Sequence, residues 1–269
     1  MSGLPAFVHT TAVGDAELAW TESGHAVRPG RTAIWAHGLT SSATAQETVG
    51  MFDWSPVIRD HRLIRYDARG HGRSTGGVDP EQYTWPNLGR DLLGLLDSVS
   101  PDEPVAGIGS SMGTATLLWA AVAEPHRFHH LVLTTPPTAG QVRAAHVVAY
   151  RAGADLIERS GLAAYEAASA GPPPAVLSGL ADARTPIAVP ESLLPSVLRG
   201  AARSDLPADV ELRALRVPTL VLAWSGDPGH PLSTARRLAT VIPGAQLCVA
   251  DTPGQLREWP QGVADFLAG

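Results

Sequence analysis

The sequence contains no lysine: all 20 of its basic residues are arginines, against 26 acidic residues, in a chain of 269. Without lysine the chain cannot form a Walker-type phosphate loop, in which a lysine contacts the β- and γ-phosphates of a nucleotide. The formal net charge of −6 and the scattered arginines also argue against a nucleic-acid partner or an anionic membrane surface.

Cysteine and long hydrophobic runs are equally scarce. Cys248 is the single cysteine, which excludes an internal disulfide framework and a thiolate metal cage. The longest apolar stretch, near residues 115–123, is far shorter than the ~20 residues of a membrane span. Residues 1–10 show no basic region before a hydrophobic one, so no secretory signal is expected. These absences predict a soluble, cytoplasmic globular protein.

What the sequence does contain is a series of short runs rich in Val, Ile and Leu that alternate with helix-like stretches. Strands are predicted at 32–36, 61–67, 105–109, 131–134, 217–224 and 245–250, and helices at 83–98 and 112–124. Continuous apolar strands that alternate with helices are typical of βαβ units, in which both faces of the sheet are buried. We therefore predict an α/β fold with a mostly parallel central sheet flanked by helices.

The region between Thr135 and Asp209 is different, because it is rich in Ala and Pro and has helical patches but no convincing strand. We predict a core formed by residues 1–136 and 208–269, with a helical cap at 137–207 inserted between two late strands. The alternative is a surface excursion without a role, although long insertions are usually functional.

The motif that carries chemistry is Gly109-Ser110-Ser111-Met112-Gly113, which fits G-x-S-x-G between a predicted strand and a predicted helix. A sharp strand-to-helix turn would expose the Ser111 hydroxyl, and the flanking glycines remove β-carbons that would clash in it. The helix N-terminus would offer free N–H groups to a developing oxyanion.

With this motif the chain resembles the α/β-hydrolases, in particular the capped single-domain type that includes esterases, lactonases and carbon–carbon bond hydrolases. Further segments that match in order are His37-Gly38 after a strand, the loop Asp67-Ala68-Arg69-Gly70-His71-Gly72-Arg73-Ser74, and Val217-Pro218-Thr219-Leu220. These motifs are specific for the fold and much less so for the substrate.

The resemblance implies that Ser111 is the nucleophile and that the N–H groups of Leu39 and Met112 form the oxyanion hole. Asp227, after the penultimate strand, stands where the family keeps its triad acid; the alternative is a helix cap or turn residue.

The resemblance further implies a small-molecule substrate, such as a small and largely apolar ester or lactone, and no metal or organic cofactor. Wall residues for its pocket are Trp35, His37, Trp85 and Trp224, although tryptophan is also a common core residue. The histidines at 126, 129 and 130 have no acidic or cysteine ligand nearby, and we predict that they lie in a solvated turn.

The match breaks at the expected base. The family order is Ser, then Asp or Glu, then His on the loop after the last strand, but this sequence has no histidine beyond His230. By spacing, Gln255 occupies the histidine's place. An amide cannot take the proton of a serine hydroxyl, so ordinary turnover requires another group.

Three explanations remain open at the level of sequence. One is that another histidine reaches Ser111, either His230 or one of His37 and His71; against His230, the following Pro231 and helical run favour a packing or capping role. A second is that Gln255 is an introduced change that disables a hydrolase. A third is a non-hydrolytic site, for a lyase, isomerase or cyclase step or for ligand binding alone.

Overall fold

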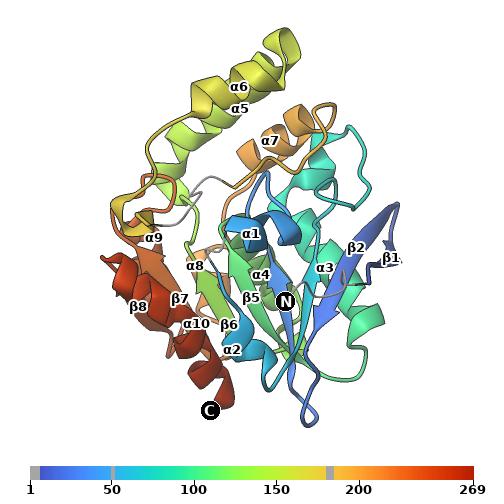
Figure 1. Cartoon of the computed structure of the whole chain (residues 1–269), viewed down its shortest axis with the longest axis vertical. Helices are drawn as coiled ribbons and strands as arrows, with labels where there is room; N and C mark the ends of the chain where they lie inside the picture. The colour runs from blue at the N-terminus through green and yellow to red at the C-terminus, as the bar shows by residue number, and fades with distance from the viewer. Residues whose placement is uncertain (1–6, 50–51, 180–184) are drawn as a thin grey trace.

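A central sheet organises the part of the chain that this computed structural model describes, which comprises residues 7–49, 52–179 and 185–269. Within it the sheet has eight strands in the order β1-β2-β4-β3-β5-β6-β7-β8 (Figure 1). Neighbouring strands from β4 to β8 are parallel, and β2 pairs antiparallel with both β1 and β4. The strands are β1 (His9–Val13), β2 (Ala16–Ser23), β3 (Thr32–Ala36), β4 (Arg62–Tyr66), β5 (Val105–Ser110), β6 (Phe128–Thr134), β7 (Thr219–Trp224) and β8 (Gln246–Ala250).

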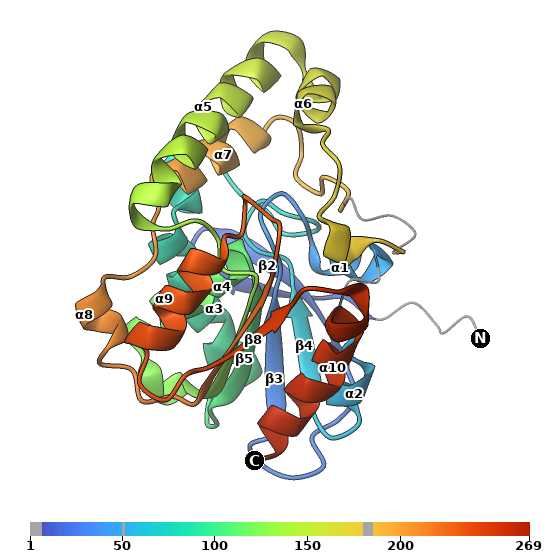
Figure 2. The same ribbon diagram turned by 90° about the vertical axis from the view of Figure 1, so that its left-hand side faces the viewer.

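Helices cover both faces of this sheet (Figure 2). One face packs against α3, α4 and α9, and the other against α2 and α10, so that the apolar side chains form two core clusters. The strands β3 and β5 are buried along their whole length, as expected for a parallel sheet covered on both sides. The predicted α/β class with a mostly parallel sheet is confirmed. The helices are α1 (Ala43–Val49), α2 (Ser55–Ile58), α3 (Trp85–Val99), α4 (Met112–Ala123), α5 (Arg143–Ser160), α6 (Leu162–Ser169), α7 (Leu194–Ala202), α8 (Asp209–Leu212), α9 (Leu232–Val241) and α10 (Pro253–Ala268).

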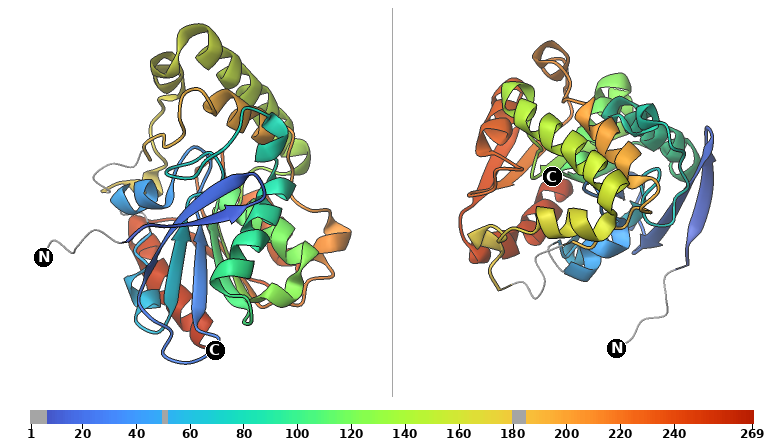
Figure 3. Two further views of the ribbon diagram at one scale, coloured as in Figure 1. Left: turned by 90° about the vertical axis from the view of Figure 1, so that its right-hand side faces the viewer. Right: turned by 90° about the horizontal axis from the view of Figure 1, so that it is seen from above.

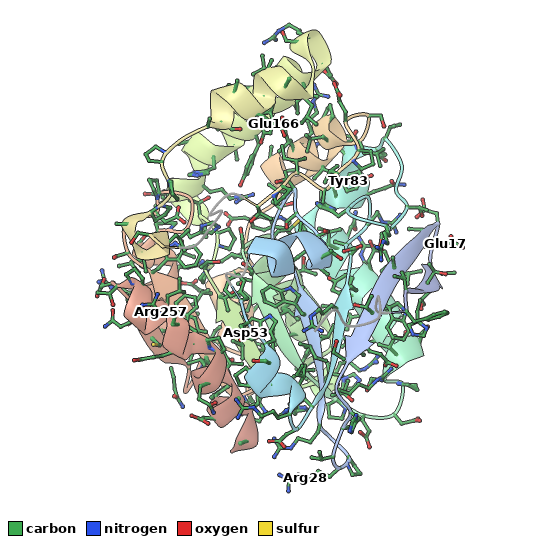
Figure 4. The ribbon with its side chains drawn as sticks, in the orientation of Figure 1. Glu17, Arg28, Asp53, Tyr83, Glu166 and Arg257 are labelled. Atoms are coloured by element: carbon green, nitrogen blue, oxygen red, sulfur yellow. The ribbon has the colours of Figure 1, made fainter. Side chains whose placement is uncertain are left out.

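The segment between β6 and β7 carries α5, α6 and α7, which lie over one end of the sheet (Figure 3). They share a small apolar cluster that includes Ile157, Val197 and Leu198 and is joined by Tyr83 from the sheet domain. Figure 4 labels Tyr83 near α7 and Glu166 on α6. Residues 180–184, which belong to the predicted cap, lie outside the described residues.

The prediction of a turn at His129 and His130 is wrong, because β6 begins at Phe128 and contains both residues. A register shift between Val105 and Ala106 lets β6 pair with β5 from its first residue, which extends the strand. The two histidine Nδ1 atoms lie 2.8 Å apart. Among the described residues, no group of three or more His, Cys, Asp or Glu is arranged to hold a metal ion.

None of the helices in the described ranges combines the length and the apolar character that crossing a membrane requires.

Candidate active site

Ser111 stands at the junction of β5 and α4, in the strand–turn–helix context that its motif predicts. Its φ of 53° lies in the left-handed region, which a serine adopts only under constraint. A β-carbon on Gly113 would lie 2.0 Å from the carbonyl oxygen of Ala36, and one on Gly109 would lie 2.6 Å from the backbone of Gly113. Both positions therefore require glycine, because the turn brings strand and helix backbones into direct contact.

His230 connects this serine to Asp227. Its Nε2 lies 2.9 Å from the Ser111 Oγ, and its Nδ1 lies 2.7 Å from the Asp227 Oδ2. The side chain of His230 is 25% exposed, which leaves the ring accessible from the cavity described below. The structure thus places His230 beside Ser111 and not in the packing or capping position that Pro231 suggested.

The charge of Asp227 assigns the protons in this chain of hydrogen bonds. Burial by itself raises the pKa of Asp227. The hydrogen bond and attraction to His230, together with the N–H donors of Trp224 and Gly229, lower this pKa by a larger amount, so the net pKa lies well below its usual value. An ionised carboxylate only accepts hydrogen bonds, so the His230 Nδ1 carries the proton and donates a hydrogen bond to Asp227. The His230 Nε2 is then the acceptor, to which the Ser111 hydroxyl donates.

A short turn after β7 holds the acid and the histidine together. Gly226 has a φ of 77°, which turns the chain away from the strand direction. The Gly229 N–H donates to the Asp227 Oδ1 at 2.8 Å, and the His230 N–H donates to the Asp227 carbonyl at 3.2 Å. The Trp224 Nε1–H donates to the Asp227 Oδ2 at 2.9 Å and so fixes the carboxylate from its other side.

Gln255 does not lie beside Ser111, and its assignment to the place of the histidine needs correction. Its Oε1 accepts hydrogen bonds from the N–H groups of Asp251 (2.8 Å) and Thr252 (3.1 Å). The Gln255 N–H in turn donates to the Thr252 Oγ1, so the two residues form a capping box at the start of α10. Gln255 lines a separate cavity of about 800 Å³ between β8 and α10, which contains none of the residues around Ser111.

Ser111 opens into a cavity of about 410 Å³ between the carboxyl ends of the strands and the inserted helices. The non-glycine residues with positive φ in the described ranges are Thr40 (62°), Ser111 (53°) and Thr135 (44°), and all of them line it. Such backbone strain concentrates at functional sites, and two of these residues are β-branched, for which the conformation is unusual. The strain therefore identifies this cavity independently of the motif.

Of the two predicted oxyanion donors, Leu39 belongs to the cavity lining and Met112 directly follows Ser111. Leu39 lines the cavity, and no described residue accepts a hydrogen bond from its N–H. Met112 is the first residue of α4, where the backbone N–H has no acceptor within the helix.

Of the four predicted wall residues, Trp224 lines the cavity and the other three do not. Trp35 is buried against the rings of Phe52 and Trp54 under α2. Trp85 is buried beneath the guanidinium of Arg143, 3.9 Å from its ring. Both tryptophans belong to the core because their large apolar rings gain most from complete burial.

His37 is a buried brace and not a wall residue. Its Nε2 accepts a hydrogen bond from the Ala68 N–H at 2.9 Å, so its Nδ1 carries the proton and donates to the Gly38 carbonyl at 2.8 Å. Burial lowers the pKa of His37 to about 4. His37 thereby fixes the loop of Gly38 and Leu39, and both its nitrogens are occupied, which leaves no ring atom for Ser111.

Sequence reasoning missed several residues that line the cavity: Gln46 on α1, Thr135 after β6, Tyr150 on α5 and Tyr165 on α6. No motif marks them, because their positions depend on how α1 and the inserted helices pack over the sheet. The lining also contains more hydroxyl and amide groups than the largely apolar pocket predicted from the sequence.

Known hydrolases resemble this chain in sequence and in fold. A family profile described as alpha/beta hydrolase fold matches residues 34–154. The sequence is 29% identical over 255 residues to 3-oxoadipate enol-lactonase 2 of Acinetobacter baylyi, covering 90% of this chain and 84% of that protein. The fold matches the enol-lactonase of Burkholderia xenovorans with a TM-score of 0.71 at 23% identity, covering 97% of this chain and 100% of that one. It matches a thermophilic esterase of Thermogutta terrifontis with a TM-score of 0.73 at 22% identity, covering 98% and 96%. The chain has the α/β-hydrolase fold and is an enzyme similar in sequence and fold to known hydrolases.

Proposed function

We propose that the protein hydrolyses a small ester, lactone or related carbonyl substrate, with Ser111 as nucleophile, His230 as general base and Asp227 as the acid that orients it. The observation that carries the proposal is the position of the His230 ring, whose two nitrogens lie 2.9 Å from the Ser111 Oγ and 2.7 Å from the Asp227 carboxylate. Serine needs such a base, since its hydroxyl is a weak nucleophile at its ordinary pKa.

In the proposed reaction, the Ser111 Oγ attacks the substrate carbonyl while His230 Nε2 takes the hydroxyl proton. The N–H groups of Leu39 and Met112 stabilise the oxyanion of the tetrahedral intermediate. Protonated His230, held by Asp227, then donates its proton to the leaving alcohol oxygen, and an acyl-enzyme remains. Water, deprotonated by the same histidine, cleaves that ester and releases Ser111.

The substrate class follows from the cavity and from the relatives. A volume of about 410 Å³ suits a small acyl compound, and ligand pockets of this kind orient their ligand through a few polar groups. Related proteins carry the names enol-lactonase and esterase, and both names describe hydrolysis at a carbonyl carbon. We also propose that residues 137–207 act as the cap of this site, because Tyr150 and Tyr165 from the inserted helices line it.

The non-hydrolytic and ligand-binding alternatives rested on the lack of a base beside Ser111. The hydrogen bond between His230 and Ser111 supplies that base and favours hydrolysis. No observation favours a lyase step over it.

The proposal is tested by exposing the protein to a fluorophosphonate and measuring its intact mass, beside initial rates on 4-nitrophenyl acetate and δ-valerolactone. We expect one adduct, located on Ser111 by peptide mapping, and hydrolysis of both substrates. Ser111→Ala is expected to abolish the adduct and lower the rates by about 10⁴-fold or more.

Ser110→Ala serves as the matched control, because Ser110 also lines the cavity but its hydroxyl faces the Thr135 hydroxyl at 3.2 Å. This variant should label at the rate of the unaltered protein. Labelling on Ser110 instead of Ser111, or hydrolysis that persists in Ser111→Ala, contradicts the proposed nucleophile.

A further inference from the structure

Gln46 lines the same cavity as Ser111 and carries a buried polar atom. The residue is 8% exposed, and its Oε1 makes no hydrogen bond within the part of the chain that the structure describes. A buried carbonyl oxygen left without a donor is unfavourable, so most such atoms in folded proteins are paired. An orphaned acceptor on a residue that lines a ligand cavity is explained when the ligand provides its donor.

The backbone around Gln46 is held firmly, so its position is a property of the fold. The Ala43 N–H at the start of α1 donates to the Oδ1 of buried Asp67 at 2.9 Å. The Ala45 N–H donates to the Ser42 Oγ at 3.0 Å, and the Gln46 N–H donates to the Ser42 carbonyl at 3.1 Å. The loop that begins at Asp67 thus anchors the first turn of α1.

The amide of Gln46 lies close to the reacting serine. A β-carbon placed on Gly38 would be 3.4 Å from the Gln46 Nε2 and 3.6 Å from the Ser111 Cβ. The Gln46 Nε2 and the Ser111 Cβ therefore lie at most 7.0 Å apart, on either flank of the same point at Gly38. A substituent within one or two bonds of the reacting carbonyl can reach Gln46 while the carbonyl carbon lies at Ser111.

We infer that Gln46 selects substrates whose acyl part carries a neutral hydrogen-bond donor, an O–H or N–H, within two bonds of the scissile carbonyl. The inference rests on the proposed serine hydrolase and adds its substrate class. An acyl group with this donor satisfies the Gln46 Oε1. An acyl group without it leaves the acceptor buried and unpaired, which a site built for a hydrogen bond penalises strongly.

The test compares kcat/KM for three 4-nitrophenyl esters on the full-length protein: the glycolate, the methoxyacetate and the propionate. Glycolate has an α-hydroxyl donor, methoxyacetate has an α-oxygen without a donor, and propionate has a methyl group in place of the hydroxyl. All three share one leaving group, and the two α-oxygen esters share the inductive effect that raises intrinsic reactivity. The same rates are measured for Gln46→Met, an apolar change of similar length.

We expect the unaltered protein to prefer glycolate over methoxyacetate by roughly 10- to 100-fold, after correction for their alkaline hydrolysis rates. Gln46→Met should abolish most of that preference. Thermal unfolding verifies that the variant is folded, and Gln46→Leu replaces it if it is not. If neither variant folds, the glycolate-to-methoxyacetate ratio of the unaltered protein decides.

A ratio near one in the unaltered protein, a preference for methoxyacetate, or a glycolate preference that persists in Gln46→Met overturns the inference. Such results leave the serine mechanism intact as long as Ser111→Ala is inactive on propionate. Activity on propionate that survives Ser111→Ala overturns the proposed mechanism instead, and failure of the unaltered protein to hydrolyse any of the three esters overturns both.

Discussion

The loops after β7 and after β8 leave the same edge of the sheet but serve different purposes. In the β7 loop, Asp227 and His230 direct their side chains toward each other and toward Ser111. In the β8 loop, the Gln255 side chain folds back onto the N–H groups of Asp251 and Thr252 and begins a helix. One loop carries the proposed acid and base, and the other caps a helix.

In the proposed mechanism, the position of the base relative to Ser111 matters more than the strand that delivers it. A separation of three residues lets one turn, closed by the Gly229 N–H on the Asp227 Oδ1, set the distance between carboxylate and imidazole. An acid and a base on separate loops depend on the packing of two elements. Here the geometry of the pair depends on one turn, and only its distance to Ser111 depends on tertiary packing.

The strongest test of the comparison is to remove a side chain from each loop. We expect His230→Ala to lower kcat/KM on 4-nitrophenyl acetate by about 10⁴-fold or more, because no other group in this arrangement takes the serine proton. Gln255→Ala should stay within about two-fold of the unaltered rate, since its amide holds only α10. Comparable losses in both variants, or an active His230→Ala, contradict the assignment of the base.

A double variant sharpens the same point. His230→Ala combined with Gln255→His restores the family's residue at the β8 loop, yet we expect no recovery of rate. The side chain at position 255 is exposed and borders the other cavity, between β8 and α10. His230→Ala alone should retain only the residual catalysis of a triad that lacks one member. If the double variant is more than about ten-fold faster than that, the β8 loop can still reach Ser111.

The next effect in size concerns the acid. Asp227→Asn keeps the shape of the side chain but removes the negative charge that keeps the proton on the His230 Nδ1. We expect a loss of about 10³-fold in kcat/KM, because the imidazolium formed during attack is no longer stabilised and the wrong tautomer becomes accessible. Fluorophosphonate labelling should slow in parallel, and a variant that labels and turns over normally shows that the carboxylate is dispensable.

A further prediction concerns the acid stability that two buried histidines on the neighbouring loops, His37 and His71, determine. Burial lowers the pKa of His37 to about 4 and, together with repulsion from His37, lowers that of His71 to about 3. In the unfolded chain both take protons near pH 6.5, so the unfolded state binds more protons below that pH. Their contribution to stability is complete above pH 6.5 and is lost as the pH falls toward 4 and then 3.

At pH 5 we expect the free energy of unfolding to fall by roughly 2 kcal/mol for each of these two histidines relative to pH 7.5. Urea unfolding at both pH values measures the change. His71→Asn keeps a donor for the Arg69 carbonyl, to which the His71 Nδ1 donates at 2.8 Å, and should show a smaller loss on acidification. An equal loss in this variant contradicts the assignment of His71 to the acid sensitivity.

Much of the fold could be predicted from the sequence because it depends on local patterns. The strand predicted at 32–36 agrees with β3 at both ends, and the helix predicted at 112–124 differs from α4 by one residue. The glycines of the G-x-S-x-G motif also predicted the turn at Ser111, since a close backbone approach leaves glycine no alternative. The composition indicates the segment inserted between β6 and β7, but it does not reveal how the inserted helices pack over the cavity.

The site was less predictable, because side-chain neighbours are set by tertiary packing. The sequence indicates His230 as one substitute for the base, yet Pro231 and the following helix favour another role. Spacing alone aligns Gln255 with the family's histidine, and spacing does not reveal that an amide prefers the free N–H groups at the start of α10. Trp35 and Trp85 are of a residue type that often lines pockets, but their large apolar rings gain more from burial in the core.

The smallest expected effect is on the thermal stability that the Gln255 capping box of the β8 loop contributes. Gln255→Ala removes the oxygen that accepts from two backbone N–H groups at the start of α10, while Gln255→Glu retains an acceptor there and adds a charge that favours the helix N-terminus. We expect the alanine variant to lose about 1 kcal/mol, or about 2 °C in Tm, and the glutamate variant to keep the stability of the unaltered protein. Differential scanning calorimetry measures both. Equal Tm values for all three proteins show that the capping box contributes nothing, in which case the glutamine at this position has neither a catalytic nor a structural explanation.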